Sequence, residues 1–209
     1  MQWLTYNLQK KSLILHPENK NPMLLADNPL IWLWRFRKRK GYGVHSPFAF
    51  RLITEVLTEH EAYYAYSQLD AQLKWYQQWR YRRFVHLLLR LANCQQPKKV
   101  AAIGLPFVEV EALKAGCQKA EVVHLQSGDV MANLPMKSDF IVADAGYAAL
   151  LSDSVNDGGL LVLKDIHRFR DVWQNVKKND TFTATFDLYD VGLAFRQQKL
   201  NKQSYIVNW

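Results

Sequence analysis

The sequence predicts an α/β fold in three layers, with helices on both faces of a mixed sheet. From Pro97 onward, short apolar runs alternate with helix-length segments, which is the pattern of parallel strand-helix-strand units. The last part of the chain holds closely spaced runs of alternating polarity, which favour antiparallel strands. The first part carries helical periodicity and most of the positive charge. We therefore expect a basic helical N-terminal extension at 1–96 and an α/β domain at 97–209.

Composition and charge limit the class of protein. The chain has 209 residues, 49% of them apolar, and can bury a sizeable core. Its net charge of +8 is uneven, because residues 1–98 hold 15 Lys and Arg against 6 Asp and Glu, whereas 99–209 hold 12 against 13. This asymmetry suggests an anionic partner or a membrane surface. Two cysteines form no disulfide framework and no apolar stretch could cross a bilayer, so we expect a cytoplasmic protein.

The N-terminal region predicts helices and one strongly basic segment. Residues 1–28 show no sustained period. Ser46-Pro47 predicts an N-cap and a first helical turn, and a second helical region runs from about 62 to 92. Between them, Trp and Phe alternate with basic residues, which suits phosphate backbones, stacked bases or lipid headgroups, although a solvated helix end is the alternative. The basic residues of this segment are Arg35, Arg37, Lys38, Arg39 and Lys40.

The helices and strands of the second part follow from apolar runs and from the glycines that mark their ends. The glycine pair after Asp157 predicts a helix stop and a turn between two parallel strands, and Gly116 predicts the end of a helix. The predicted strands are 100–105, 121–126, 140–143, 160–163, 183–189, 192–197 and 204–209, of which the last three should form an antiparallel set. The predicted helices are 108–115 and 169–178.

Two aspartates follow neighbouring predicted strands. Asp144 comes directly after strand 140–143, and Asp165 comes after strand 160–163 and Lys164. The carboxyl ends of parallel strands meet at one edge of a sheet, where ligands bind. We therefore expect Asp144 and Asp165 to share a site at this edge. Capping of the next helix is the alternative for Asp165.

Six segments carry a resemblance to a known family when taken together and in order. They are KGYGVHSPFAFRL at 40–52, YYAY at 63–66, FVHLLLRLANCQQPKKVAAIG at 84–104, DFIVADA at 139–145, GGLLVLKDIH at 158–167 and DLYDVGLAFRQ at 187–197. Over roughly 38–209 the chain resembles the class I S-adenosylmethionine-dependent methyltransferases, in particular small bacterial members with an N-terminal helical extension. The central unit is also similar to O-methyltransferases of the catechol and caffeoyl-CoA type. The resemblance implies a Rossmann-like fold and S-adenosylmethionine as cofactor.

The sequence departs from the family pattern in three places. The E-x-G-x-G turn after the first strand keeps only Gly104, with Ala102 and Pro106 at the other two positions. One strand is missing before residue 140, so the domain is shortened by about one βα unit, and strand 121–126 is either the second or the third of the family order. Lys164 replaces an acidic partner of Asp165 and opposes a divalent ion, so we predict no metal site. A salt bridge from Lys164 to the aspartates is the alternative.

The resemblance assigns roles to individual residues. Asp144 and Asp165 would orient the substrate. His45, between a glycine-rich turn and an N-cap, and His167, after strand 160–163, are the candidate bases from their own positions, because an imidazole suits proton uptake near neutral pH. A backbone contact at a helix start is the alternative for His45, and a structural role is the alternative for His167. The candidate cofactor-binding residues are Gly104, Leu105, Gln126 and Ser127, of which Gln126 or Ser127 replaces the ribose-binding carboxylate if strand 121–126 is the second.

Two functions follow as expectations. The first is methyl transfer to an oxygen or nitrogen of an unidentified acceptor, either a small molecule or a nucleic acid. The alternative is a catalytically inactive methyltransferase-like protein. In that case the basic N-terminal region would bind RNA, another anionic partner or a membrane surface.

Overall fold

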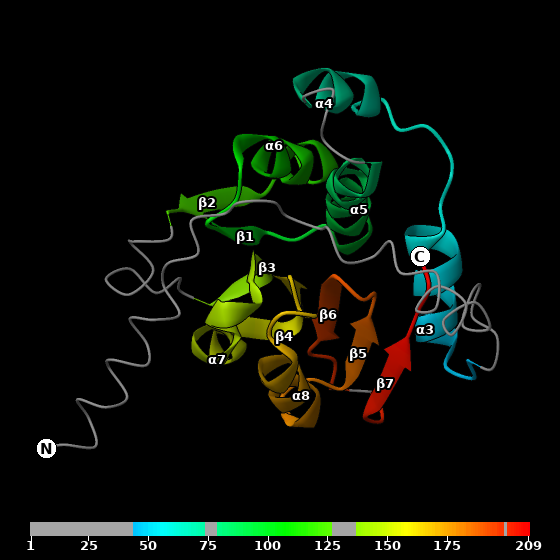
Figure 1. The fold of residues 1–209 in the computed structure, drawn as a ribbon, viewed down its shortest axis with the longest axis vertical. Coiled ribbons are helices and arrows are strands. Elements are labelled where there is room, and N and C mark those ends of the chain that lie inside the picture. Colours follow the sequence, from blue (N-terminus) through cyan, green and yellow to red (C-terminus); the bar gives the residue numbers. More distant parts are fainter. Residues whose placement is uncertain (1–43, 74–78, 127–136, 199) are drawn as a thin grey trace, which may run out of the picture.

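The computed structural model describes residues 44–73, 79–126, 137–198 and 200–209, and Figure 1 shows their arrangement. A seven-stranded mixed sheet has the order β2-β1-β3-β4-β6-β5-β7, with helices on both faces. This is the Rossmann-like three-layer α/β fold that the sequence predicts. Its strands are β1 (Lys99–Ile103), β2 (Glu121–Leu125), β3 (Ser138–Asp144), β4 (Val155–Lys164), β5 (Ala184–Asp187), β6 (Val191–Phe195) and β7 (Gln203–Ile206).

The first four strands are parallel, and β1 lies between β2 and β3. The side chains of β1 and β3 are almost all buried, as expected for parallel strands covered by helices on both faces. Because β2 pairs directly with β1, strand 121–126 takes the second place of the order 3-2-1-4 and not the third. Within the described ranges no strand lies beyond β2, and the predicted shortening by about one βα unit stays a prediction.

The C-terminal strands differ from the prediction in one respect. β6 is antiparallel to both β4 and β5, as predicted, but β7 is parallel to β5. The chain leaves β6 at Phe195, which lies opposite Ala184 at the start of β5, and β7 also starts at this end of the sheet. Because β7 is placed beyond β5 and not beside β6, its neighbour runs in the same direction.

The predicted turn at residues 157–159 is wrong, because this segment lies inside β4. Ser138 of β3 pairs with Val155, but Phe140 pairs with Leu160, so the residues between them form a bulge in β4. Gly158 has φ 79°, and its N–H donates to the Arg196 carbonyl oxygen at 2.6 Å. The glycines therefore serve a bulge, and the helix before them is only the short α7 (Ala148–Leu151).

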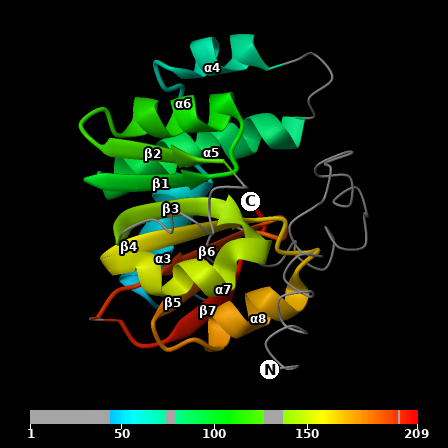
Figure 2. The ribbon, with the colours of Figure 1, turned by 90° about the vertical axis from the view of Figure 1, so that its left-hand side faces the viewer.

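The helices form two layers. Figure 2 shows α7 and α8 (Arg170–Lys178) on the near face of the sheet, with α3 and α5 behind it. The far-face elements are α3 (Pro47–Arg51), the π-helical turn η3 (Leu52–Leu57), α4 (Tyr66–Gln72), α5 (Trp79–Gln95) and α6 (Phe107–Gly116). As predicted, Ser46 is the N-cap of α3, where its hydroxyl accepts from the Ala49 N–H at 3.4 Å. The helical region predicted at 62–92 is divided between α4 and α5.

The helices at residues 44–95 share one hydrophobic core with the sheet. Leu88 of α5 and Ala49 of α3 belong to the same buried cluster as Phe186 and Phe195. The Phe48 ring packs edge-on against Phe195 at 5.1 Å between ring centroids. The boundary predicted between 96 and 97 therefore separates a helix from a strand but not two packing units. No helix in the described part of the chain is long and apolar enough to span a membrane. Residues 1–28 and the basic run at 35–40 lie outside the described residues.

Candidate functional site

The carboxyl edge of the sheet has a topological switch point between β1 and β3, where the strand order reverses. Gly104 directly follows β1 and has φ 64°, a conformation that glycine adopts without a steric penalty. Its N–H donates to the Leu125 carbonyl oxygen at 2.8 Å. Asp144, half-buried, ends β3 on the other side of the switch point. Two of the predicted site residues therefore flank the position where ligands bind in such sheets.

Asp144 and Asp165 lie at the same edge, as predicted from the parallel strands. Burial is the main cause that raises the pKa of Asp144, with the Lys164 ammonium opposing and the nearby Asp165 carboxylate adding to the rise. Asp144 and Lys164 are also paired in the register of β3 and β4. Asp165 has φ 58°, so the backbone turns sharply just past the strand end. The two carboxylates are close enough for their charges to interact.

Lys164 makes its direct ion pair with a residue that the sequence analysis does not select. Its Nζ atom lies 2.9 and 3.0 Å from the two carboxylate oxygens of Glu109, which is fully buried in the first turn of α6. The Phe84 ring covers the ammonium group at 5.5 Å. Burial alone would lower the pKa of Lys164, but the Glu109 and Asp144 carboxylates raise it, so this lysine stays charged. The salt bridge considered for Lys164 is therefore made mainly to Glu109.

Glu109 is held from two sides inside the protein. Burial raises its pKa, and the Lys164 ammonium counteracts part of that rise. Tyr81 of α5 also hydrogen-bonds to the Glu109 carboxylate, and burial raises the pKa of this tyrosine well above its ordinary range. A signal for Glu109 was present in the sequence, because an acidic residue stands between Val108 and Val110 in a helix whose neighbouring positions are apolar.

His167 lies near the same edge within a second set of contacts. Its Nδ1 atom is 3.1 Å from Asp190 Oδ1, and the two side chains are 4% and 6% exposed. The two atoms lie close together, but this contact does not meet the geometry of a hydrogen bond. The Tyr189 ring stacks on the imidazole at 5.6 Å, and Arg80 of α5 lies 3.7 Å from the other Asp190 oxygen. A carboxylate that is hydrogen-bonded to a histidine orients a general base, and here the two groups are adjacent without that hydrogen bond.

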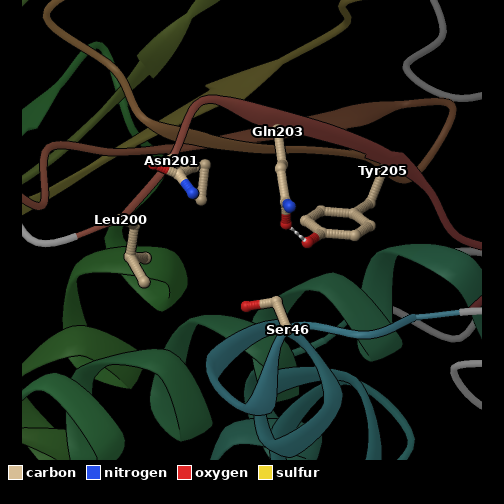
Figure 3. A pocket seen from close by; sticks show the side chains of 6 residues that line it. Ser46, Leu200, Asn201, Gln203 and Tyr205 are labelled. Carbon is tan, nitrogen blue, oxygen red and sulfur yellow. Dashed lines mark hydrogen bonds between the residues drawn. The ribbon is translucent and has the colours of Figure 1, made fainter.

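His45 is not brought together with the two aspartates. It is exposed and precedes Ser46, which lines a cavity of about 220 Å³ with Ala184 and Gln203. Figure 3 shows Ser46 and Gln203 in this cavity. Ala184 and Gln203 begin β5 and β7, so this cavity lies at the amino edge of the sheet, opposite the carboxyl edge. The location of His45 follows from the packing of α3, because the Phe48 ring of this helix contacts Phe186 of β5 and Phe195 of β6.

The other predicted cofactor-binding residues differ in how exposed they are. Leu105 is buried at 4% exposure, and its carbonyl oxygen contacts His124 Nε2 at 3.0 Å. Gln126 is exposed and directly follows β2, whereas Ser127 lies outside the described residues. Phe107, two residues after Leu105, is 67% exposed. In the described ranges no group of three or more His, Cys, Asp or Glu side chains could hold a metal ion.

Comparisons with known proteins give similarities of fold alone. No model of a protein family matches the chain, and no curated protein matches it significantly in sequence. Among solved structures, the S-adenosylhomocysteine-bound methyltransferase PaMTH1 of Podospora anserina is similar at 12% identity and TM-score 0.49, over 86% of this chain and 99% of that one. The likeness is one of fold. Such values say nothing about individual residues.

Two further solved structures have comparable scores. An O-methyltransferase of Bacillus cereus in complex with S-adenosylhomocysteine has 11% identity and TM-score 0.45, over 69% of this chain and 96% of that one. The O-methyltransferase TomG of Streptomyces achromogenes, in complex with S-adenosylmethionine, has 12% identity and TM-score 0.46, over 78% and 98%.

Proposed function

We propose that this chain binds S-adenosylmethionine at the carboxyl edge of its sheet and transfers the methyl group to an oxygen or nitrogen of a small acceptor. The observation that carries the proposal is the pair of residues at the switch point. Gly104, with φ 64°, follows β1, and the half-buried Asp144 ends β3. A glycine turn after the first strand is the backbone arrangement of nucleotide sites in open parallel sheets, and Asp144 adds a carboxylate on the other side of the same switch point.

The residues present fit this cofactor at two points and depart from the family pattern at two others. Gly104 leaves room for the backbone to approach a ligand closely, and the Gln126 amide at the end of β2 can hydrogen-bond to ribose hydroxyls. Gln126 lacks the charge of the expected carboxylate, and Pro106 has no N–H to donate. When bound, the cofactor supplies a methyl group on a sulfonium that already carries its leaving group.

The electrostatics of the edge suit an acceptor that must lose a proton. Because Lys164 is paired with the buried Glu109, it neutralises the negative charges of Asp144 and Asp165 only in part. Arg168 is a further cation nearby. The two aspartates can therefore accept hydrogen bonds from an acceptor hydroxyl or amine and orient it. His167, beside Asp190, is the candidate group to take up the proton.

A second candidate function is non-catalytic binding of an anionic partner such as RNA. This candidate is favoured by Pro106 and Gln126, because the family pattern has a glycine and a ribose-binding carboxylate at these two positions. On this hypothesis the basic run at 35–40 makes the contacts. Arg80 and Arg82 contribute less, because they lie near Asp190 and Asp70, at 3.7 and 3.4 Å.

Calorimetric titration with S-adenosylhomocysteine tests the proposal. Two glycines with positive φ provide the test variant and its matched control. Gly104 and Gly158 have φ 64° and 79°, so Gly→Ala costs both a similar strain of roughly 1–2 kcal/mol. Only Gly104 adjoins the proposed site, so Gly104→Ala should weaken or abolish binding while Gly158→Ala keeps the wild-type affinity. No heat from the wild-type protein at about millimolar ligand would overturn the proposal. RNA binding that weakens steeply with salt would then support the second candidate.

A further inference from the structure

A larger cavity, of about 660 Å³, lies apart from the carboxyl-edge residues described above. It is enclosed by one side of α5, by the segment that connects η3 to α4, and by the C-terminal residues Asn208 and Trp209. Gly104, Asp144 and Asp165 do not line it. Its volume is in the range of small-molecule pockets in proteins.

The α5 wall of this cavity is basic. Arg83, His86 and Arg90 line it with spacings of three and four residues, which place them on one face of the helix. Arg90 is only 7% exposed. The Arg83 guanidinium lies 5.0 Å from the Trp209 ring centroid, so a positive wall adjoins an indole ring.

Three of the lining residues each have a buried polar side-chain atom with no hydrogen-bond partner among the described residues. These atoms are Tyr66 Oη, Arg90 Nε and Asn208 Nδ2, and all three can donate. The other end of the Arg90 side chain is fixed, because Nη1 donates to the Glu59 carbonyl oxygen at 2.5 Å. An unpaired buried donor costs free energy, so such groups point to a missing acceptor. An oxygen-rich anion is the kind of ligand that accepts hydrogen bonds from such donors.

The donors are held in place before any ligand arrives. The Tyr66 ring stacks on His86 at 3.7 Å between centroids, and His86 Nε2 lies 2.9 Å from Asp70 Oδ1. Two carboxylates also line the cavity. Glu59 Oε1 accepts from the backbone N–H groups of His60 and Glu61, so it is engaged with its own loop, and Glu61 is exposed.

We propose that this cavity binds an organic phosphate, with the phosphate group against Arg90 and Tyr66 and a planar ring against Trp209. Guanidinium groups match phosphate oxygens in geometry and charge, which favours phosphate over a neutral ligand. Indole rings stack on planar bases. The site is independent of the methyltransferase proposal, since the two share no residue.

The test is calorimetric titration with adenosine 5′-monophosphate, adenosine and inorganic phosphate. Adenosine 5′-monophosphate should bind more tightly than either part alone. Tyr66→Phe should weaken its binding roughly tenfold or more, because a hydrogen bond to a charged group is lost. The same change should not lower the stability of the free protein, since the Tyr66 hydroxyl has no partner there.

The matched control is Tyr64→Phe. The Tyr64 side chain is 71% exposed and its hydroxyl donates to the Ala115 carbonyl oxygen at 2.7 Å, outside the cavity, so this variant should keep wild-type affinity. Gly104→Ala should keep it as well, which separates this site from the carboxyl edge. Equal binding of adenosine and its monophosphate, unchanged affinity in Tyr66→Phe, or no binding at about millimolar ligand would each overturn the proposal.

Discussion

At the scale of single residues, the buried pair of Glu109 and Lys164 should govern local stability. Lys164→Met leaves the Glu109 carboxylate buried without its ammonium and should cost about 3–5 kcal/mol of unfolding free energy. Adding Glu109→Gln should recover much of this loss, because the uncompensated charge is then removed as well. Urea unfolding of the two variants measures both effects.

A control for this prediction lies on the same helix. Lys114 is exposed and lies 3.1 Å from Glu111, so Lys114→Met should cost only about 0–1 kcal/mol. A double variant no more stable than Lys164→Met would show that the cost lies in packing and not in the buried charge.

The same pair shows what residue-level reasoning can and cannot predict. Asp144 and Asp165 were predicted together because the register of parallel strands places their carboxyl ends at one edge. Glu109 was missed because its partner lies 55 positions further along the chain, and only the packing of α6 on the sheet brings them together. His45 was misplaced for a related reason, since the sequence shows the N-cap beside it but not the edge of the sheet that α3 covers.

At the scale of elements, the close approach of α5 and α6 depends on Gly116. A Cβ atom at this position would meet the Leu89 carbonyl oxygen at 2.4 Å and the Ala92 Cβ at 2.8 Å. Gly116→Ala should therefore push the two helices apart and cost about 1–3 kcal/mol, measured by urea unfolding. Lys114→Ala, an exposed change on the same helix, should stay close to wild type. Equal stability of the two variants would mean that the helices can separate without cost.

Helices and strands were predicted well where apolar runs are long. They were predicted less well where a glycine fits more than one backbone structure. The strands and α8 follow from periodicity, but Gly158 and Gly159 gave the same signal for a turn as for the bulge that they form. The direction of β7 relative to β5 depends on which edge the chain reaches after β6. No local pattern encodes that choice.

At the scale of the whole molecule, the N-terminal helices and the sheet should unfold together. Leu88 of α5 is fully buried in the core that also contains strand residues, so Leu88→Ala should lower the stability of the whole protein by about 2–5 kcal/mol. Far-UV circular dichroism and tryptophan fluorescence should report one coincident transition. Phe50→Ala, at a side chain that is 47% exposed, is the control and should have little effect. Two separate transitions would contradict a common core.

The fold class followed from the sequence, but the place of strand 121–126 did not. Whether that strand is second or third is decided by its pairing with β1, a contact between distant segments that leaves no trace in local composition. Charge asymmetry likewise indicated a basic first half without showing that Arg80 and Arg82 lie beside carboxylates.

The stacking of Tyr189 on His167 has a consequence for the hairpin that joins β5 and β6. The Leu188 N–H donates to the Val191 carbonyl oxygen at 2.9 Å, so Tyr189 and Asp190 are the two central residues of a tight loop. Tyr189 has φ 80°, a value that such loops usually give to glycine. A glycine here would relax the backbone but would leave the imidazole without its aromatic neighbour. The loop thus keeps a residue in a strained backbone conformation whose ring packs against the His167 imidazole.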